Sequence, residues 1–466
     1  MNQSFIVSGS QFGDEGKGTL CDYLTSKYNI HENVRYNGGS QASHTVVNDN
    51  VSHKFSQLGS SSLNNDTKTY LSSNTIVNPF NIVTEAKVLS LKLRNTPEEI
   101  LSNIYIDKDA LIVTPYHSLL NKLRELSSKN NRIGSVGSGV SEVNRLKDET
   151  GIYITINDLY TQEYMDKLLE LFDYTCLYLN ERRHLIDDKL FNKLISKEDI
   201  FYLTNKRNRE YIISCYSNLI DSNILNIVDG ILSFHKKGNV LFEGSQGLLL
   251  DKNYGIKPNV TSLDTTNKYG CDLSKELNMK MIKYGCIGAY NSRHGMGLLP
   301  TYDKSLQIKD LNQTYSYYQG SPRYGWFDCV LTRYSQSILK NDYLFMSCID
   351  NLSKFKEIKI CDSYTYYGQI DEEFKNTFEY YIDLNRIIIK NIKRNSNNLR
   401  YYLSKCIPNY IIVNGWNIDI SDIKDVEKLP SEVNDYISLI EYLTNTHIPI
   451  IGIGPSRNQK LERKIS

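Results

Sequence analysis

Near its start the chain places an apolar stretch directly before a glycine-rich turn, and this order strongly limits the folds open to it. Residues 3–9 predict a buried strand, and residues 18–28 have the length of a helix. The turn between them contains Gly13, Gly16 and Gly18. Glycine lets backbone N–H groups approach a ligand closely, and a helix that begins at such a turn directs its positive end toward an anion. The pattern therefore predicts a phosphate site at the end of a strand.

The same turn carries charged side chains of both signs. Lys17 supplies a positive charge for phosphate groups, whereas Asp14 would repel them unless a divalent cation lies between or unless it accepts a proton. The usual phosphate-loop pattern is not matched, because Gln11 stands at a required glycine and Gly18 follows the lysine. A purely structural turn with an exposed pair of carboxylates, Asp14 and Glu15, is the alternative interpretation.

A second segment repeats the order of strand, small-residue turn and strand. Residues 34–47 contain several small residues, which allow the backbone to contact a ligand, and one histidine, His44. Histidine is the side chain best suited to donate or accept a proton near neutral pH. A lone histidine is more often structural, but its neighbours here favour a role in proton transfer.

Residues 11–18 and 41–45 together resemble two glycine-rich loops of the adenylosuccinate synthetase family. The resemblance continues over some 450 positions, and such an ordered series of blocks is far more specific than any single glycine motif. Further matching blocks lie at residues 133–139, 242–251, 260–262, 265–266, 289–297, 325–328 and 454–455.

The resemblance implies an α/β fold with one large, mainly parallel, twisted sheet covered by helices, and a single domain over residues 1–466. Alternation of short strands and helices agrees with this fold class. Residues 152–236 have helical periods and are expected to form a helical elaboration, and the charged, Asn-rich residues 390–400 a surface connection. Strands are expected at 3–9, 34–36, 46–48, 69–72, 104–107, 239–243, 284–289, 343–348, 357–361 and 448–452, and helices at 18–28, 79–94 and 116–128.

The function that the resemblance implies is a carbon–nitrogen ligase. Aspartate would be joined to C6 of a 6-oxopurine nucleotide, with IMP favoured, through a 6-phosphoryl intermediate driven by hydrolysis of GTP or ATP, giving adenylosuccinate. Asp14 would accept the N1 proton and contact Mg²⁺, with the backbone carbonyl of Ser43 as the second contact of the metal. His44 would act opposite Asp14 as a proton donor, Lys17 would offset charge on the transferred group, and Gln246 completes the catalytic set.

The family's binding residues map onto three groups of positions, and an arginine that reaches the neighbouring subunit implies a homodimer. Arg145 or Lys147 is the candidate for that arginine. The donor nucleotide would be held by Gly13, Glu15, Gly16, Lys17, Gly18, Thr45, Asp350, Gly454 and Pro455. The purine monophosphate would be held by Asp14, Gln41, Ser135, Val136, Arg145, Gln246, Thr261 and Arg293, and aspartate by Gly320, Ser321 and Arg323.

Departures from the family pattern leave part of the substrate choice open. In the segment that reads guanine, Asp350 is kept but Cys348 replaces the lysine that covers the base, so GTP and ATP both stay possible. The segment that binds aspartate, residues 318–323, keeps one arginine, although a dicarboxylate usually calls for several. Val136 replaces a threonine in the monophosphate loop.

Two alternative functions follow from these departures. A viral branch of the family makes 2-aminoadenylosuccinate from a guanine deoxynucleotide with an adenine nucleotide as donor, and Phe12 and residues 293–294 are similar to that branch. The branch lacks the aspartate that is present here as Asp14, which favours the IMP reaction. A non-catalytic nucleotide-binding paralogue is the other alternative, and the intact set of catalytic residues argues against it.

Composition excludes several other classes of protein. A net charge of +1 provides no field for a nucleic acid, so small-molecule substrates are the expected partners. The nine cysteines are scattered, odd in number and never spaced as Cys-x-x-Cys, which favours reduced thiols. A mean hydropathy of −0.42, the lack of a long apolar run and the lack of a signal peptide predict a cytoplasmic protein without a membrane segment.

Overall fold

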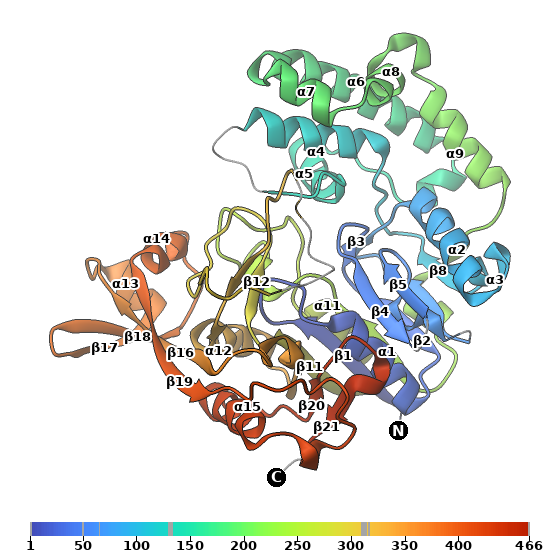
Figure 1. Cartoon of the computed structure of the whole chain (residues 1–466). Helices are drawn as coiled ribbons and strands as arrows, with labels where there is room; N and C mark the ends of the chain where they lie inside the picture. Colours follow the sequence, from blue (N-terminus) through green and yellow to red (C-terminus); the bar gives the residue numbers. More distant parts are fainter. Residues whose placement is uncertain are drawn as a thin grey trace.

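The computed structural model describes residues 2–48, 51–64, 66–128, 134–308, 315 and 317–464. Its centre is a ten-stranded sheet in the order β21-β20-β15-β11-β1-β10-β2-β6-β8-β9 (Figure 1). All of its neighbouring strands are parallel except β20 and β21, which confirms the predicted α/β fold. The strands are β1 (Gln3–Gly9), β2 (Glu32–Arg35), β6 (Lys68–Leu71), β8 (Ile104–Asp107), β9 (Asn226–Val228), β10 (Val240–Glu243), β11 (Lys280–Gly288), β15 (Tyr343–Ser347), β20 (Ile450–Gly452) and β21 (Lys460–Glu462).

Strand β1 lies in the middle of this sheet and is covered on both faces, which is why the consecutive apolar residues Phe5, Ile6 and Val7 are all buried. Phe5 and Val7 pack against α1 (Lys17–Tyr28), whereas Ile6 belongs to the cluster that includes Leu273 of α11 (Lys268–Glu276). Successive strand residues point to opposite faces, so the two helices cover opposite sides of the sheet. The glycine-rich turn leaves β1 at its carboxyl end, where parallel α/β sheets bind their ligands.

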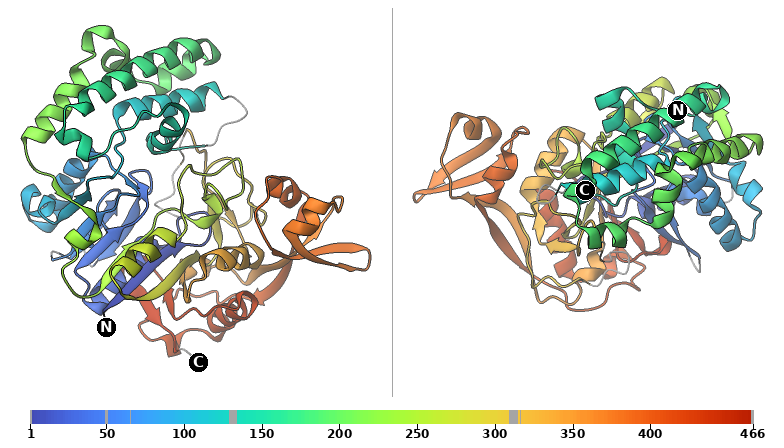
Figure 2. Two further views of the ribbon diagram at one scale, coloured as in Figure 1. Left: turned by 180° about the vertical axis from the view of Figure 1, so that it is seen from behind. Right: turned by 90° about the horizontal axis from the view of Figure 1, so that it is seen from above.

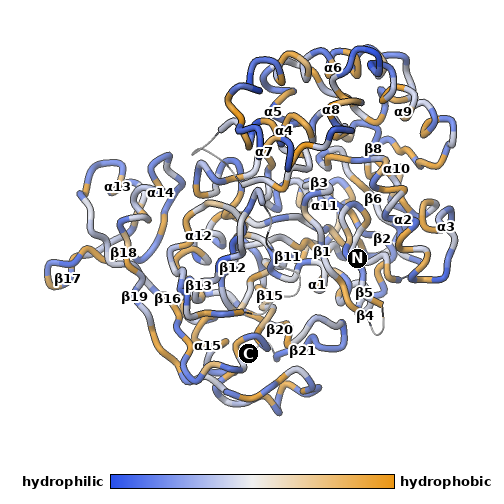
Figure 3. The backbone as a smooth tube through the Cα atoms, turned by 45° about the horizontal axis from the view of Figure 1, so that its top comes forward, coloured by the Kyte–Doolittle hydropathy of each residue, from blue (hydrophilic) through white to orange (hydrophobic). Residues whose placement is uncertain are grey.

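A layer of helices lies above one end of the sheet (Figure 1). The helices expected within residues 152–236 are present, and α4 and α5 belong to the same layer because α4 packs on both α5 and α6. One apolar cluster runs from Ile106 in β8 to Leu171 in α6, so the layer shares its core with the sheet. Figure 3 shows polar and apolar residues alternating along these helices, as in helices with one buried face. They are α4 (Pro115–Ser127), α5 (Val140–Thr150), α6 (Glu163–Arg182), α7 (Asp188–Leu194), α8 (Lys197–Thr204) and α9 (Tyr211–Asp221). Helix α10 (Gly230–Phe234) lies against the sheet instead, where Ile231 shares an apolar cluster with Ile6 of β1.

A second, mainly antiparallel sheet projects from the body of the molecule (Figure 2). The expected surface connection at residues 390–400 is wrong at both ends, because residues 390–392 complete β18 and residues 399–400 begin α14 (Leu399–Ser404). Ile392 and Leu399 are buried in one apolar cluster, which holds this polar stretch in place. The sheet contains β14 (Phe327–Asp328), β16 (Glu357–Tyr366), β17 (Phe378–Asp383), β18 (Arg386–Ile392) and β19 (Cys406–Asn414).

The strand expected at residues 46–48 is present but lies outside the main sheet. It belongs to β4 (His44–Asn48), which pairs with β5 (Val51–Phe55) in a two-stranded antiparallel unit. This pairing places Lys54 opposite Thr45.

Within the described residues no helix has the length and apolar character that crossing a bilayer requires.

Candidate active site

A cavity of about 630 Å³ lies at the carboxyl ends of the central strands. Most of the residues predicted for the site line it together, although they come from distant parts of the sequence. Those that line it are residues 13–18, Gln41, Ser43, His44, Thr45, Ser135, Val136, Gln246, Thr261, Arg293, Asp350, Gly454 and Pro455. Those that do not are Arg145, Gly320, Ser321 and Arg323.

Within the glycine-rich turn, the two carboxylates have different surroundings. Glu15 is buried, and its Oε1 accepts hydrogen bonds from the N–H groups of Gln11 (2.6 Å) and Gly13 (3.0 Å). Its Oε2 lies 3.1 Å from Nζ of Lys17. Burial acts to lower the pKa of Lys17, but the Glu15 carboxylate outweighs it and raises that pKa above its ordinary value. Glu15 thus shapes the turn and keeps Lys17 charged.

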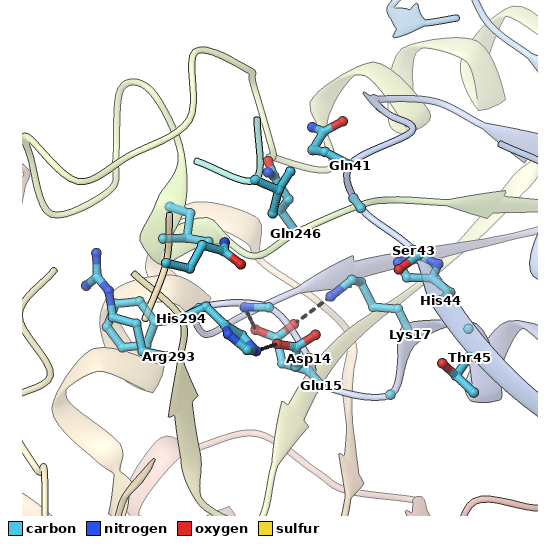
Figure 4. A pocket seen from close by; sticks show the side chains of 18 of the residues that line it. Asp14, Glu15, Lys17, Gln41, Ser43, His44, Thr45, Gln246, Arg293 and His294 are labelled. Carbon is cyan, nitrogen blue, oxygen red and sulfur yellow. Dashed lines mark hydrogen bonds and ion pairs between the residues drawn. The ribbon is translucent and has the colours of Figure 1, made fainter. Parts of the chain in front are cut away.

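Asp14 is the carboxylate that faces the cavity, with 48% of its side chain exposed. Its backbone has a positive φ of 56°, a conformation that aspartate tolerates better than most residues. Nε2 of His294 lies 3.4 Å from its Oδ2 (Figure 4). In Figure 4, His294 and Arg293 lie on one side of Asp14, and Lys17 lies on the other.

His44 is held by a carboxylate that lies behind it, away from the turn. Its Nδ1 lies 2.5 Å from Oε1 of Glu243, and Oε2 of the same carboxylate accepts hydrogen bonds from Asn33 (2.8 Å) and from the N–H of Ser60 (2.9 Å). Burial alone would raise the pKa of Glu243, but Arg35, 3.9 Å away, and the His44 contact lower it to about 2. Glu243 is therefore ionised, and the proton of the imidazole lies on Nδ1.

The other ring nitrogen of His44 is buried and, among the described residues, has no hydrogen-bond partner. Burial lowers the pKa of His44 below its ordinary value, although Glu243 opposes this effect. The imidazole is therefore neutral in the cavity without a ligand. An anion beside Nε2 would favour the charged form, which can donate a proton to it.

Glycine is required where His44 approaches the first helix. A Cβ on Gly18 would lie 2.6 Å from Cβ of His44 and 2.9 Å from Oγ of Ser60. A Cβ on Gly247 would likewise lie 2.4 Å from the carbonyl oxygen of Gln11. These contacts explain why the turn and the segment after β10 contain glycine, since any side chain there would push the two loops apart.

Two glutamine side chains present unpaired amide atoms in the site. Both amide atoms of Gln41, and Oε1 of Gln246, are buried and have no hydrogen-bond partner among the described residues. A buried polar atom without a partner costs about 1–3 kcal/mol. Amides in this state are suited to a ligand that both donates and accepts hydrogen bonds, such as a purine base.

Arg293 brings a buried positive charge to the wall of the cavity. It is 1% exposed, donates to the carbonyls of Leu298 (2.7 Å) and Asn259 (2.9 Å), and lies over the ring of Phe12 at 4.4 Å. None of the ion pairs in the described part of the chain involves it, and burial, with repulsion from Arg323, lowers its pKa to about 9. An anionic ligand would relieve this cost.

The remaining predicted residues have other contacts. Arg323 donates to the carbonyls of Gly295 and Gly297, both at 2.6 Å, so it holds the loop beside Arg293 in place. Arg145 forms an ion pair with Glu142 at 2.9 Å on α5. Gln319, next to the predicted aspartate-binding residues, does line the cavity.

Several residues of the site were not predicted from the sequence. Glu243 lies inside a matched block, so a signal for it was available, whereas His294 was noted only as a similarity to the viral branch. Asn121 of α4 accepts a hydrogen bond from Oγ of Ser135 (3.0 Å) and thereby fixes the small-residue loop at residues 134–138. The other unpredicted lining residues with charge are Lys54 and Lys460.

For a metal ion, Asp14 is the available carboxylate. Among the residues that the structure describes, no cluster of three or more His, Cys, Asp or Glu side chains suits a metal ion. Mg²⁺, however, is commonly held by one or two carboxylates together with substrate phosphates and water. Asp14 beside the phosphate turn, with the backbone of Ser43 in the same cavity, fits that mode of binding.

The comparisons with known proteins agree on one family. The sequence model of adenylosuccinate synthetase matches residues 6–461. Relatives named adenylosuccinate synthetase from an Exiguobacterium species and from Trichodesmium erythraeum are both 30% identical to this chain, and 98% of the chain is aligned in each case. The alignments cover 97% and 95% of those relatives.

Two solved structures share the fold. The fully ligated adenylosuccinate synthetase from Plasmodium falciparum has a TM-score of 0.71 at 20% identity, with 99% of both chains covered. The succinoaminodeoxyadenylate synthetase of cyanophage S-2L, bound to dGMP and dATP, has a TM-score of 0.56 at 12% identity, with 99% of this chain and 95% of that one covered. On the strength of the full-length sequence match, the chain belongs to the adenylosuccinate synthetase family of ligases.

Proposed function

We propose that the protein joins aspartate to C6 of IMP and forms adenylosuccinate, with hydrolysis of GTP. The observation that carries this proposal is that one cavity contains a carboxylate of the glycine-rich turn, Asp14, which can accept a proton, and an unpaired imidazole nitrogen, Nε2 of His44. A protein that only binds nucleotides has no need of both groups. Family membership supports the same reaction class.

In the first step, Asp14 accepts the N1 proton of the 6-oxopurine, and O6 attacks the γ-phosphorus of the donor. The donor's P–O bond breaks, and its nucleoside diphosphate leaves. Lys17 and the first N–H groups of α1 offset the negative charge of the phosphoryl group while it moves from the donor to O6. His44, once protonated, donates a hydrogen bond from Nε2 to this phosphoryl group, while Glu243 accepts one from its Nδ1.

In the second step, the amine of aspartate attacks C6, and the C6–O6 bond breaks with loss of inorganic phosphate. The oxygen that was O6 of the purine leaves with that phosphate. We assign aspartate binding to the segment of Gly320, Ser321 and Arg323, where Gln319 reaches the cavity. The motion of these residues toward the ligand is part of the proposal.

The purine monophosphate would lie between Arg293, which has no ion-pair partner among the described residues, and the two glutamines whose amide atoms lack hydrogen-bond partners. Gln41 and Gln246 suit the purine, and Arg293 suits the phosphate. Ser135, Val136 and Thr261 line the part of the cavity between them.

The family requires a divalent metal, and Mg²⁺ is the ion that we propose. When bound, it neutralises charge on the donor's phosphates. Asp14 and the carbonyl of Ser43 are the protein groups that would hold it.

For the assembled protein we propose a cytoplasmic homodimer. A two-fold dimer is the commonest symmetry of soluble oligomers. Arg145 would complete the partner's monophosphate site, since its side chain is partly exposed on α5 and does not line its own cavity.

A second candidate is the synthesis of 2-aminoadenylosuccinate from GMP or dGMP with ATP as donor. His294, which is similar to the viral branch, lies 3.4 Å from Asp14, the residue at which that branch differs. The presence of Asp14 favours the IMP reaction.

A product-resolved incubation distinguishes these functions. The protein is mixed with Mg²⁺, aspartate, one of IMP, GMP or dGMP, and either GTP or ATP, and the products are separated by chromatography. Adenylosuccinate from IMP is the expected product. A product from GMP or dGMP alone would establish the second candidate, and no product from any pair, with nucleotide binding intact, would establish a non-catalytic paralogue.

A further inference from the structure

The wall of the cavity contains a buried lysine, Lys460, that has no role in the chemistry proposed above. Lys460 begins the edge strand β21 and pairs with Gly452 in the antiparallel register of β20 and β21. A Cβ on Gly452 would lie 3.6 Å from Cδ of Lys460, so the stem of the lysine runs over this glycine. The side chain thereby reaches the cavity from the end of the chain.

The ammonium group of Lys460 is only partly satisfied by the protein. Its Nζ donates to the carbonyls of Gly454 (2.9 Å) and Ser456 (2.8 Å), and the residue is 7% exposed. An ammonium has three protons, so among the described residues one remains for a ligand. Burial lowers the pKa of Lys460 to about 8, while Cys348, Asp22 and Asp350 act in the opposite direction, so it is mostly charged at neutral pH.

Asp350 lies on the same wall, in the short helix η7 (Ile349–Leu352) that follows β15. The wall therefore offers a hydrogen-bond donor from Lys460 beside an acceptor from Asp350. A guanine edge is complementary to this pair, because it presents an acceptor at O6 next to donors at N1 and the 2-amino group. Adenine instead presents a donor at position 6, which would face the ammonium.

We propose that Lys460 determines the specificity for the donor nucleotide by donating a hydrogen bond to O6 of its purine, with Asp350 accepting from N1–H and the 2-amino group. This inference rests on the proposed function in placing the donor base at this wall. It assigns the choice of GTP over ATP to a cation that comes from the edge strand of the sheet.

Binding of four nucleoside diphosphates isolates the O6 contact. They are GDP, IDP, which lacks the 2-amino group, the diphosphate of 2-aminopurine riboside, which lacks both O6 and the N1 proton, and ADP. The dissociation constant of each is measured by calorimetry with Mg²⁺ for the parent protein, Lys460→Met and Asp350→Ala. Lys464→Met serves as the matched control, because Lys464 is a surface lysine close to Lys460 in sequence.

The expected result for Lys460→Met is a loss of affinity of roughly 10- to 100-fold for GDP and IDP, the effect of one hydrogen bond to a charged group. Affinity for the 2-aminopurine analogue and ADP should change by less than about threefold, and Lys464→Met should change none of the four. Asp350→Ala should weaken GDP more than IDP or the 2-aminopurine analogue, because GDP is the ligand that presents both donors to Asp350.

Equal weakening of all four diphosphates by Lys460→Met would mean that the lysine only holds the loop at residues 454–456, and it would overturn the proposal. No change would overturn it too. Should Lys460→Met fail to fold, Asp350→Ala decides: the acceptor of N1–H is gone from that variant, so the O6 contact alone must still make GDP bind at least tenfold more tightly than the analogue without O6. Adenylosuccinate formation is scored separately, so a failure of the proposed reaction is distinguishable from a failure of this contact.

Discussion

Nδ1 of His44 lies 2.5 Å from Oε1 of Glu243, and this contact leaves the other imidazole nitrogen as the one that faces the ligand. Because Glu243 is ionised, with a pKa of about 2, the tautomer of His44 is fixed before any substrate binds. Gly18 allows the imidazole to lie against the first turn of α1. The glycine-rich turn and His44 are thereby joined in one rigid unit.

Replacement of Glu243 by glutamine tests this relationship. The amide keeps the size of the side chain but loses the charge that stabilises the imidazolium. We expect turnover to fall roughly 10- to 100-fold, which is part of the 100- to 10,000-fold that general acid–base catalysis provides. Steady-state kinetics should show little change in KM for the nucleotides. Ser60→Ala removes a hydrogen bond that Oγ of Ser60 donates to Glu243 but keeps the carboxylate, so a similar fall in this variant would mean that the hydrogen bonds of Glu243, and not its charge, are responsible.

Binding of an anionic nucleotide should add a proton to His44. Its pKa is lowered by burial, so at pH 7 the imidazole is neutral, and phosphate beside Nε2 favours the charged form. The heat of binding of a non-hydrolysable GTP analogue should therefore depend on the ionisation enthalpy of the buffer. His44→Asn should remove part of this dependence. Identical dependence in both proteins would contradict proton uptake by His44.

Asp14→Asn should bind nucleotides but lose about 100- to 10,000-fold in turnover, because an amide cannot accept the N1 proton. Calorimetry of nucleotide binding and an assay of adenylosuccinate formation measure the two properties separately. Glu15 is not a substitute base, since it is buried and hydrogen-bonded within the turn. Turnover within a few-fold of the parent would refute the role of Asp14.

Gly18→Ala should impair catalysis, because an added methyl would meet His44 and Ser60. The added methyl would lie 2.6 Å from Cβ of His44, a distance that ordinary packing does not allow. We expect turnover to fall at least tenfold and thermal stability to fall by roughly 1–3 kcal/mol, the usual cost of overpacking. Gly270→Ala is the control, because Gly270 lies in helix α11, does not line the cavity, and an added Cβ there would also be tightly packed, at 3.0 Å from the ring of Tyr36. Equal activity of both variants would show that His44 need not lie against α1.

Stability should depend on pH through His117, which lies in α4 outside the site. It is buried, its Nδ1 accepts the N–H of Thr114 at 3.1 Å, and burial lowers its pKa to about 3. Between pH 6.5 and 3 the unfolded chain binds a proton that the folded protein does not, so the free energy of unfolding falls as the pH falls. The slope for one such group is about 1.4 kcal/mol per pH unit.

Urea unfolding between pH 7 and pH 5 measures this slope in the parent and in His117→Asn. The variant should be less stable at pH 7 but should show a shallower dependence on pH. Parallel curves would mean that His117 does not titrate on unfolding.

The sequence predicted best what depends on short segments. Strand β1, the turn after it and α1 follow from one apolar run and its glycines, and they lie where expected. The stretch at residues 390–400 was misread because its composition is polar, whereas its conformation depends on two buried residues, Ile392 and Leu399, that pack in a distant cluster.

The same division holds for the site. Asp14, Lys17 and His44 lie in recognisable loops and were found from them. The partners that decide their behaviour come from elsewhere in the fold, as His294 does for Asp14. Lys460 carries no local signal at all, since its place at the cavity depends on the register of β21 against β20.

The proposed reaction requires that O6 of the purine is phosphorylated before aspartate attacks C6. IMP labelled with ¹⁸O at position 6 tests it directly, with Mg²⁺, GTP and aspartate present and inorganic phosphate analysed by mass spectrometry. We expect one ¹⁸O atom in phosphate for each adenylosuccinate formed, because O6 leaves with the phosphate. Adenylosuccinate formed with the label released into water, or IMP left unconverted by a protein that binds all the substrates, would contradict it.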